Sequence, residues 1–168
     1  MKRLGKSPLA ALALASASLG MAVPVSAQVQ YRQKISHSTK HCHSGNDAPA
    51  VWITVNGIST SQGTVRVQSY RGTRDDWLKK GRWINRIELP ARAGQMTVCM
   101  PLPASGTYAI AIRHDINGNG DTDLKEDGGG MSNNPSINIF NLGKPSYKKT
   151  AFTVNGGVKS ITINMRYW

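Results

Sequence analysis

Hydrophobic residues alternate with polar ones in several short segments, a pattern that is typical of half-buried β-strands. The alternating segments are residues 51–56, 64–70, 96–100 and 158–168. Residues 108–112 are apolar on both faces, which indicates a central strand, and Phe152 and Val154 indicate one more. Pairs such as Asn56-Gly57 separate the segments, as turn residues do.

Strands at short spacing, without a long helical period, predict an all-β domain. We expect an antiparallel β-sandwich or a small barrel of about seven strands. We place it at residues 50–168 and expect a loose N-terminal arm at residues 28–49, where no period is visible. Residues 75–80 suit a helical turn, because Asp75 and Asp76 favour a helix N-terminus.

Residues 1–27 have the pattern of a secretory signal peptide. Basic residues precede an apolar run of mostly Ala and Leu, and small residues end at Ala27. An N-terminal membrane anchor is the alternative, but Ser, Gly and Pro residues make the run a poor membrane span. We therefore expect a periplasmic or secreted protein that begins at Gln28 and has no transmembrane segment after cleavage.

The chain is strongly basic, with 21 Lys and Arg residues against 9 Asp and Glu residues. Removing Lys2, Arg3 and Lys6 leaves 18 against 9, a net charge near +9. A positive field attracts the anionic lipids and acidic polysaccharides of a cell envelope, whereas export removes the protein from nucleic acid. The alternative is a basic surface that only keeps the protein soluble.

Two cysteines in an exported chain indicate a disulfide between Cys42 and Cys99. If Met96, Val98 and Met100 face the core, Cys99 points outward, where the arm can reach it. Two free thiols are the alternative, which an oxidising compartment disfavours.

The arm also holds a dense group of potential ligands for zinc or copper, namely His37, His41 and His43 beside Cys42. A disulfide would remove the thiolate from this group. Metal binding by the arm therefore remains the less favoured of the two interpretations.

Residues 115–126 fit the calcium-loop pattern D-x-[DN]-x-[DN]-G-x5-E. Calcium prefers six to eight oxygen ligands, and Gly120 allows the sharp turn around the ion. The predicted metal ligands are Asp115, Asn117, Asn119, Asp121 through its carbonyl, Asp123 and Glu126. Because the loop follows a predicted strand, it shares the loop of an EF-hand and not its two helices.

The alternative is an Asn- and Gly-rich turn that binds nothing. Five of the nine acidic residues lie within residues 115–127, however, and would repel one another without a cation. A metal ion, or the chain's own Lys and Arg, is expected to neutralise them. Gly128–Gly130 predict a hinge after the loop, and Ser132, Asn133 and Asn134 either fold back onto it or form an ordinary turn.

Residues 106–120, together with 130–134, resemble a bacterial exported family, the domain of unknown function numbered 2141. The shared motifs are a G-x-Y-A strand, an HD-x-N-x-N loop and a later G-aromatic-SNN, where Met131 takes the place of the aromatic residue. The resemblance extends from about Ala50 to the C-terminus. It implies a transthyretin- or immunoglobulin-like sandwich and no particular activity.

The chain lacks the G-x-S-x-G and H-E-x-x-H patterns of common hydrolases. His114 and Asp115 are adjacent on a predicted strand and point to opposite faces, so we expect His114 to be structural. The chain has four tryptophans, Trp52, Trp77, Trp83 and Trp168. Trp52 and Trp168 lie on faces opposite the expected core, where they either stack on sugars, sit at a membrane interface or are covered by the fold.

The sequence therefore favours a non-enzymatic exported module with a calcium-binding loop, which binds or supports an envelope component. The alternatives are a hydrolase that uses the loop metal as a Lewis acid, and a carbohydrate-binding or adhesion module that uses Trp77 and Trp83.

Overall fold

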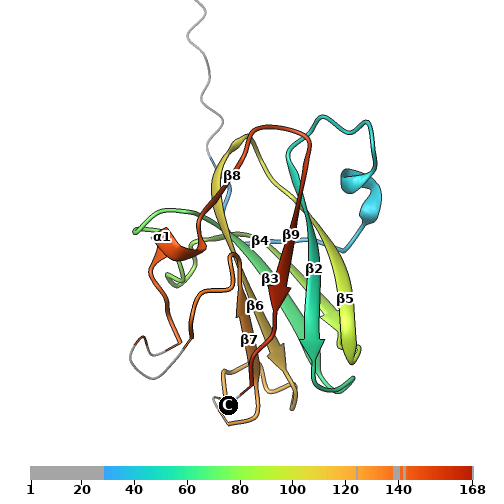
Figure 1. The fold of residues 1–168 in the computed structure, drawn as a ribbon, viewed down its shortest axis with the longest axis vertical. Helices are drawn as coiled ribbons and strands as arrows, with labels where there is room; N and C mark the ends of the chain where they lie inside the picture. Colours follow the sequence, from blue (N-terminus) through green and yellow to red (C-terminus); the bar gives the residue numbers. More distant parts are fainter. Residues whose placement is uncertain (1–28, 124, 138–140, 142, 168) are drawn as a thin grey trace, which may run out of the picture.

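The computed structural model describes residues 29–123, 125–137, 141 and 143–167, and shows two packed β-sheets (Figure 1). The strands are β1 (Gln33–Lys34), β2 (Ala50–Ile58), β3 (Thr64–Arg71), β4 (Trp83–Pro90), β5 (Gly94–Pro101), β6 (Gly106–Asp115), β7 (Gly128–Met131), β8 (Phe152–Val154) and β9 (Val158–Asn164). Two short helices, η1 (Thr39–Cys42) and α1 (Tyr147–Thr150), lie outside the sheets. The predicted all-β sandwich is confirmed.

The larger sheet has the order β1-β4-β3-β6-β7, with β8 also paired to β6, and the smaller sheet has the order β5-β2-β9. Most neighbouring strands are antiparallel, as predicted. Two pairs are parallel: β1 with β4, and β2 with the C-terminal strand β9. The second pair arises because the chain crosses from β8 in one sheet to β9 in the other (Figure 1).

The core lies between the two sheets and is built from the alternating residues of the predicted strands. Fully covered side chains include Val51, Ile53, Val55, Val65, Val67, Val98, Met100, Ile110 and Ile163. Burying each such side chain contributes about 1.5–3 kcal/mol to folding. Tyr108 and His114, at the two ends of β6, also lie in this interior and are fully buried.

The sequence pattern did not reveal β4 or β7. In β4 the core-facing residues Ile84 and Ile87 are three positions apart, because a register shift in the pairing with β3 interrupts the alternation. The predicted glycine hinge is wrong, since Gly128–Met131 form an edge strand against β6. A Cβ atom on Gly128 would lie 2.3 Å from the Tyr167 ring, so glycine allows the C-terminal segment to approach closely.

The arm is packed against the sandwich and is not loose. Its strand β1 pairs with β4, and Val29, Tyr31 and Ile35 contact the main core. Residues 73–82 contain turns and no helix, and their backbone bonds run from Trp77 N to Thr73 O, from Lys79 N to Asp76 O and from Arg82 N to Lys79 O.

A second hydrophobic cluster covers one end of the outer face of the larger sheet. Its buried members are Tyr70, Trp77, Trp83, Ala109, Met131 and Ile137. Trp77 and Trp83 are only 7% and 8% exposed, so the fold covers both rings, which is one of the alternatives that the sequence left open. Trp52 is half-buried, and Trp168 lies outside the described residues.

The signal peptide predicted at residues 1–27 also lies outside the described residues. In the remainder of the chain, neither short helix has the length and apolar character needed to cross a membrane.

Candidate functional site

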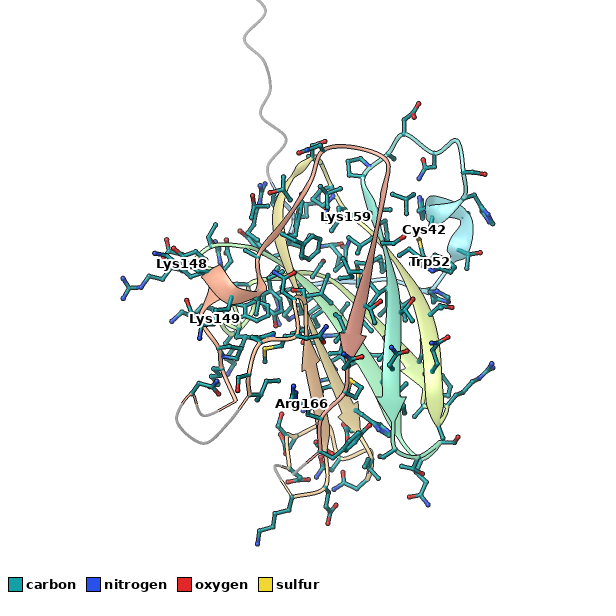
Figure 2. All side chains as sticks on the ribbon, in the orientation of Figure 1. Cys42, Trp52, Lys148, Lys149, Lys159 and Arg166 are labelled. Carbon is teal, nitrogen blue, oxygen red and sulfur yellow. A yellow bond between two sulfur atoms is a disulfide. The ribbon has the colours of Figure 1, made fainter. Side chains whose placement is uncertain are left out.

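The disulfide between Cys42 and Cys99 is confirmed, with the two Cα atoms 5.9 Å apart. Cys42 ends η1, which lies beside the edge strand β5 and near Trp52 (Figure 2). Trp52 and Cys99 are direct partners in the β2–β5 ladder, so both point out of the smaller sheet toward the arm. The arm thereby covers part of an otherwise open sheet face.

The same contacts involve two of the residues predicted to bind zinc or copper in the arm. Cys42 is bonded to sulfur, and the Nε2 atom of His37 accepts a hydrogen bond of 3.3 Å from the Cys99 backbone. In the parts of the chain that the structure describes, no three His, Cys, Asp or Glu side chains come together as a metal site. His37, His41, Cys42 and His43 therefore do not share one coordination centre in this conformation.

The acidic loop wraps around its own first residue. Asp115 ends β6, and its Oδ2 atom accepts a hydrogen bond of 3.0 Å from the backbone N–H of Gly120. The Asn117 and Asn119 side chains accept bonds from the backbone two residues further on, at 3.1 and 2.8 Å. These side-chain bonds stabilise the turns that the Asn-Gly sequence predicts.

Four of the predicted ligands lie together at the centre of the loop. The Asp123 carboxylate accepts bonds of 2.9 and 2.7 Å from the amides of Asn117 and Asn119. Glu126 accepts a bond of 3.2 Å from the Asn117 amide. The bonds from Asn117 and then Asn119 hold the pKa of Asp123 below its usual range, because they favour the ionised carboxylate.

A cation from the chain itself occupies one side of the loop. Arg113 points to the same face of β6 as Asp115, and its Nη2 atom lies 3.1 Å from the Asp115 carboxylate. The guanidinium also donates to Gly120 O at 2.7 Å and to the Thr122 hydroxyl at 2.9 Å. Arg113 therefore binds the first residue and the middle of the loop together.

The Asp115 carboxylate is nevertheless only half satisfied. The residue is 4% exposed, and its Oδ1 atom is buried without a hydrogen-bond partner in the described part of the chain. A buried ionised oxygen without a partner is costly, so this atom favours a further cation or donor inside the loop.

Asp127, just after the motif, closes the loop at its base. Its two oxygen atoms accept bonds of 3.2 Å from Ile116 N and 3.0 Å from Asp123 N, and the residue is 2% exposed. The motif pattern ends at Glu126 and gave no signal for this role. Asp121 contributes its backbone N–H to the loop through Asn119, and its predicted carbonyl ligand stays a prediction.

The residues of the loop fit a calcium ion in their chemistry. The oxygen donors come from two amides as well as from carboxylates, which is the mixture that calcium accepts. Each amide oxygen has two lone pairs, so Asn117 and Asn119 can accept a backbone bond and still offer a metal ligand. The two positive charges of Arg113 and Lys125 do not balance the five acidic residues within residues 115–127, so the loop keeps a net negative charge.

His114, on the opposite face of β6, does not form a catalytic pair with Asp115. Its ring nitrogens lie 2.8 Å from the Tyr167 hydroxyl and 2.7 Å from the Gln62 carbonyl. The hydroxyl also accepts a bond of 3.1 Å from Ser59 N. Fully buried His114 therefore joins the β2–β3 turn to the C-terminal segment and fixes the strand from which the loop starts.

The sequence model of the bacterial family DUF2141, described as uncharacterized protein conserved in bacteria, matches residues 53–162. The chain belongs to the DUF2141 family. No curated protein and no solved structure matches the chain. The DUF2141 match covers strands β3 to β8, most of β2 and β9, and the whole acidic loop.

The SNN residues that follow β7 in this DUF2141 chain bond to strands β6 and β9 and to the end of α1, and no bond joins them to the acidic loop among the described residues. Ser132 donates a bond of 2.6 Å to Thr150 O and accepts one of 3.0 Å from Ile110 N. Asn134 donates to Thr162 O in the smaller sheet at 2.9 Å. Both asparagines have positive φ angles, of 62° and 46°, which Asn tolerates better than most residues. This motif therefore fastens the two sheets together.

Proposed function

We propose that this protein is an exported, non-enzymatic β-sandwich module whose acidic loop binds one calcium ion and which binds or supports a component of the cell envelope. The residues proposed to hold the ion are Asp115, Asn117, Asn119, Asp121, Asp123 and Glu126. The ion would cancel repulsion among the carboxylates and fix the connection that leaves the central strand β6.

The observation that carries the proposal is the buried Asp115 oxygen without a partner among the described residues, at the start of a loop where Asn117 contacts both Asp123 and Glu126. Arg113 alone does not satisfy both Asp115 oxygens. An ion at the centre would take Asp115 Oδ1 and replace the amide donors that now hold Asp123.

Export is supported by the pattern of the first residues and by the disulfide, which persists in oxidising compartments. The net charge near +9 without the signal residues supports binding to an anionic envelope component. The two buried tryptophans lend no support to sugar stacking as the alternative. A metal-assisted hydrolase would require an open ligand position on the ion, next to a substrate.

The proposal is tested by thermal melting of the processed protein in millimolar calcium and in chelator. We expect calcium to raise the melting temperature, with a dissociation constant on the order of 10⁻⁴–10⁻³ M, as in other extracellular modules. At a hundred times that constant the free energy of unfolding rises by about 2.7 kcal/mol. Magnesium, which prefers a smaller octahedral shell, should substitute poorly.

Two ligand variants and one control accompany this experiment. Asp123→Asn and Glu126→Gln should weaken the response to calcium, because each removes a carboxylate from the centre of the loop. Asp47→Asn removes an exposed acid outside the loop and should leave the response unchanged. If the wild type melts at the same temperature in calcium and in chelator, the loop binds no calcium.

A further inference from the structure

A groove of about 500 Å³ lies on the outer face of the larger sheet, next to the acidic loop. Its lining includes Arg66 and Gln68 on β3, Ala111 and Arg113 on β6, Met131 on β7, and Lys144 before α1. A volume of this size is typical of sites for small molecules. The second hydrophobic cluster covers the other end of the same face, so the groove is the part of the face that remains open.

The floor of the groove is apolar. Ala111 and Met131 are direct partners across the β6–β7 ladder, and both contact the second hydrophobic cluster. Leu78 and Ile137 extend this floor from the two segments that cover the sheet. The apolar surface is therefore continuous with a packed core and is held rigidly.

The wall of the groove is cationic. Arg66 and Arg113 are direct partners across the β3–β6 ladder, a placement in which like charges repel. Arg86 is not a lining residue, but it lies on the neighbouring strand β4, opposite the lining residue Gln68, and adds to the positive charge nearby. The side chains of Arg66, Arg86 and Arg113 are only 21%, 18% and 15% exposed, so their charges are poorly screened by water.

Two acids of the loop, Asp123 and Asp127, also line the groove, and both oxygens of the buried Asp127 accept backbone hydrogen bonds. Few other acids neutralise the wall. Glu88 is shared, because it lies 2.6 Å from Arg66 Nε and 3.8 Å from Arg86 Nη1. Arg113 is bound to Asp115 in the loop. Among the described residues, the Nη atoms of Arg66 have no acceptor and Lys144 forms no ion pair. Burial, and then the charge of Arg66, lowers the pKa of Arg86, as expected of crowded cations.

We propose that this groove binds a small amphipathic anion, a carboxylate or phosphate that carries an alkyl chain. The anionic group would accept hydrogen bonds from the Nη atoms of Arg66 and from Lys144, and the chain would lie over Ala111 and Met131. This inference deepens the proposed function. It rests on that function in one respect, because the cell envelope is taken as the source of the anion. The groove shares Arg113 and Asp123 with the acidic loop, so its binding is tested both with and without calcium.

The experiment is calorimetric titration of the processed protein with octanoate and with octyl phosphate. We expect both to bind, since each combines an anion with an apolar chain; the tighter of the two distinguishes a fatty acid from a lipid phosphate as the source. Octanol lacks the charge and inorganic phosphate lacks the chain, so each should bind at least about tenfold more weakly, which corresponds to about 1.4 kcal/mol.

Arg66→Gln should weaken the binding of both anions by about tenfold or more, because it removes the unpaired Nη donors. Ala111→Leu should also weaken it, by filling the floor. Lys159→Gln is the matched control, since it removes an exposed cation from β9 in the other sheet (Figure 2). Equal effects of Arg66→Gln and Lys159→Gln would overturn the proposal, as they would indicate a general basic surface that binds polyanions.

All titrations are carried out in calcium and in chelator. Absence of binding in both conditions, or equal affinity for octanol and octanoate, would overturn the groove as an anion site. If the anions bind but calcium does not change the melting temperature, the calcium proposal is wrong and the anion-binding proposal stands. The two proposals can therefore fail separately.

Discussion

The guanidinium of Arg113 lies 3.1 Å from the carboxylate of Asp115, two residues further along the same strand and on the same face. Because it also binds Gly120 O, Arg113 holds the loop around Asp115 in the way that a metal ion would. A calcium ion on Oδ1 and this guanidinium on Oδ2 would neutralise the same carboxylate together. The relationship makes Arg113 the residue that distinguishes a calcium loop from a loop neutralised by the chain alone.

We predict that Arg113→Gln destabilises the protein mainly in the absence of calcium. Removing the only cation that contacts Asp115 within the described residues leaves a buried carboxylate uncompensated, at a cost of about 3 kcal/mol. Added calcium should restore most of this loss, because it supplies the missing charge. Urea unfolding in calcium and in chelator measures the difference.

Arg66→Gln is the matched control for this prediction. Arg66 faces Arg113 across the β3–β6 ladder and forms its ion pair with Glu88, outside the loop. Its removal should change stability equally in calcium and in chelator. An equal loss for Arg113→Gln in both conditions would mean that no ion compensates the Asp115 charge when Arg113 is removed.

The sequence predicted the sandwich and the loop for a physical reason. Alternation in β2, β3 and β5 follows from burial of one face, and the loop motif is a contiguous segment; neither signal depends on distant contacts. The strand β4 was missed because a register shift breaks its alternation, and β7 because three glycines carry no hydrophobic pattern. Both strands are defined by pairing with residues remote in sequence.

The site was predicted less completely than the fold. The motif identified residues whose side chains meet, such as Asn117 and Asp123. It did not identify Arg113, although the period of two along β6 places residues 113 and 115 on one face, a signal that was available. The burial of Trp77 was not predictable from local pattern, because the segment before α1 covers it, through a bond of 2.8 Å from the indole to Pro145 O.

We predict that removing the disulfide lowers the free energy of unfolding by about 4 kcal/mol. Cys42 and Cys99 are 57 residues apart, and joining them restricts the unfolded chain. The double variant Cys42→Ala/Cys99→Ala should unfold at lower urea concentration than the oxidised wild type. Reduced and oxidised wild type that unfold at the same urea concentration would contradict this prediction.

We predict that Tyr70 makes the protein less stable in alkaline solution. Burial in the second hydrophobic cluster raises the pKa of its hydroxyl from 10.0 to about 12, against the opposing charges of Arg86 and Arg66. The unfolded chain loses this proton near pH 10 and the folded chain keeps it. Stability is therefore complete below pH 10 and declines as the pH rises toward 12, by about 1.4 kcal/mol per pH unit.

Tyr70→Phe isolates this contribution, because it removes the titrating group and keeps the ring. The difference in free energy of unfolding between wild type and Tyr70→Phe should grow from about pH 10 upward. A difference that stays constant across this range would mean that the Tyr70 hydroxyl titrates normally in the folded state.

We predict that Gly63→Ala disrupts both the fold and the acidic loop. Gly63 ends the β2–β3 turn with a φ of +71°, and a Cβ atom there would lie 1.9 Å from the backbone oxygen of Asp115. The clash is with backbone, so β6 must shift at the residue that starts the loop. We expect a loss of about 2–4 kcal/mol, combining left-handed strain with displacement of this strand end.

Gly94→Ala separates the two causes. Gly94 has a φ of +89° and nothing within 4 Å of an added Cβ atom, so it reports the backbone strain alone, about 1–2 kcal/mol. The excess loss in Gly63→Ala then measures the close approach to Asp115. If calcium stabilises the protein, Gly63→Ala should also weaken that stabilisation, whereas Gly94→Ala should preserve it, because only Gly63 supports the strand end that carries the first ligand. Equal losses for the two variants, measured by urea unfolding, would show that the turn tolerates a side chain beside the loop.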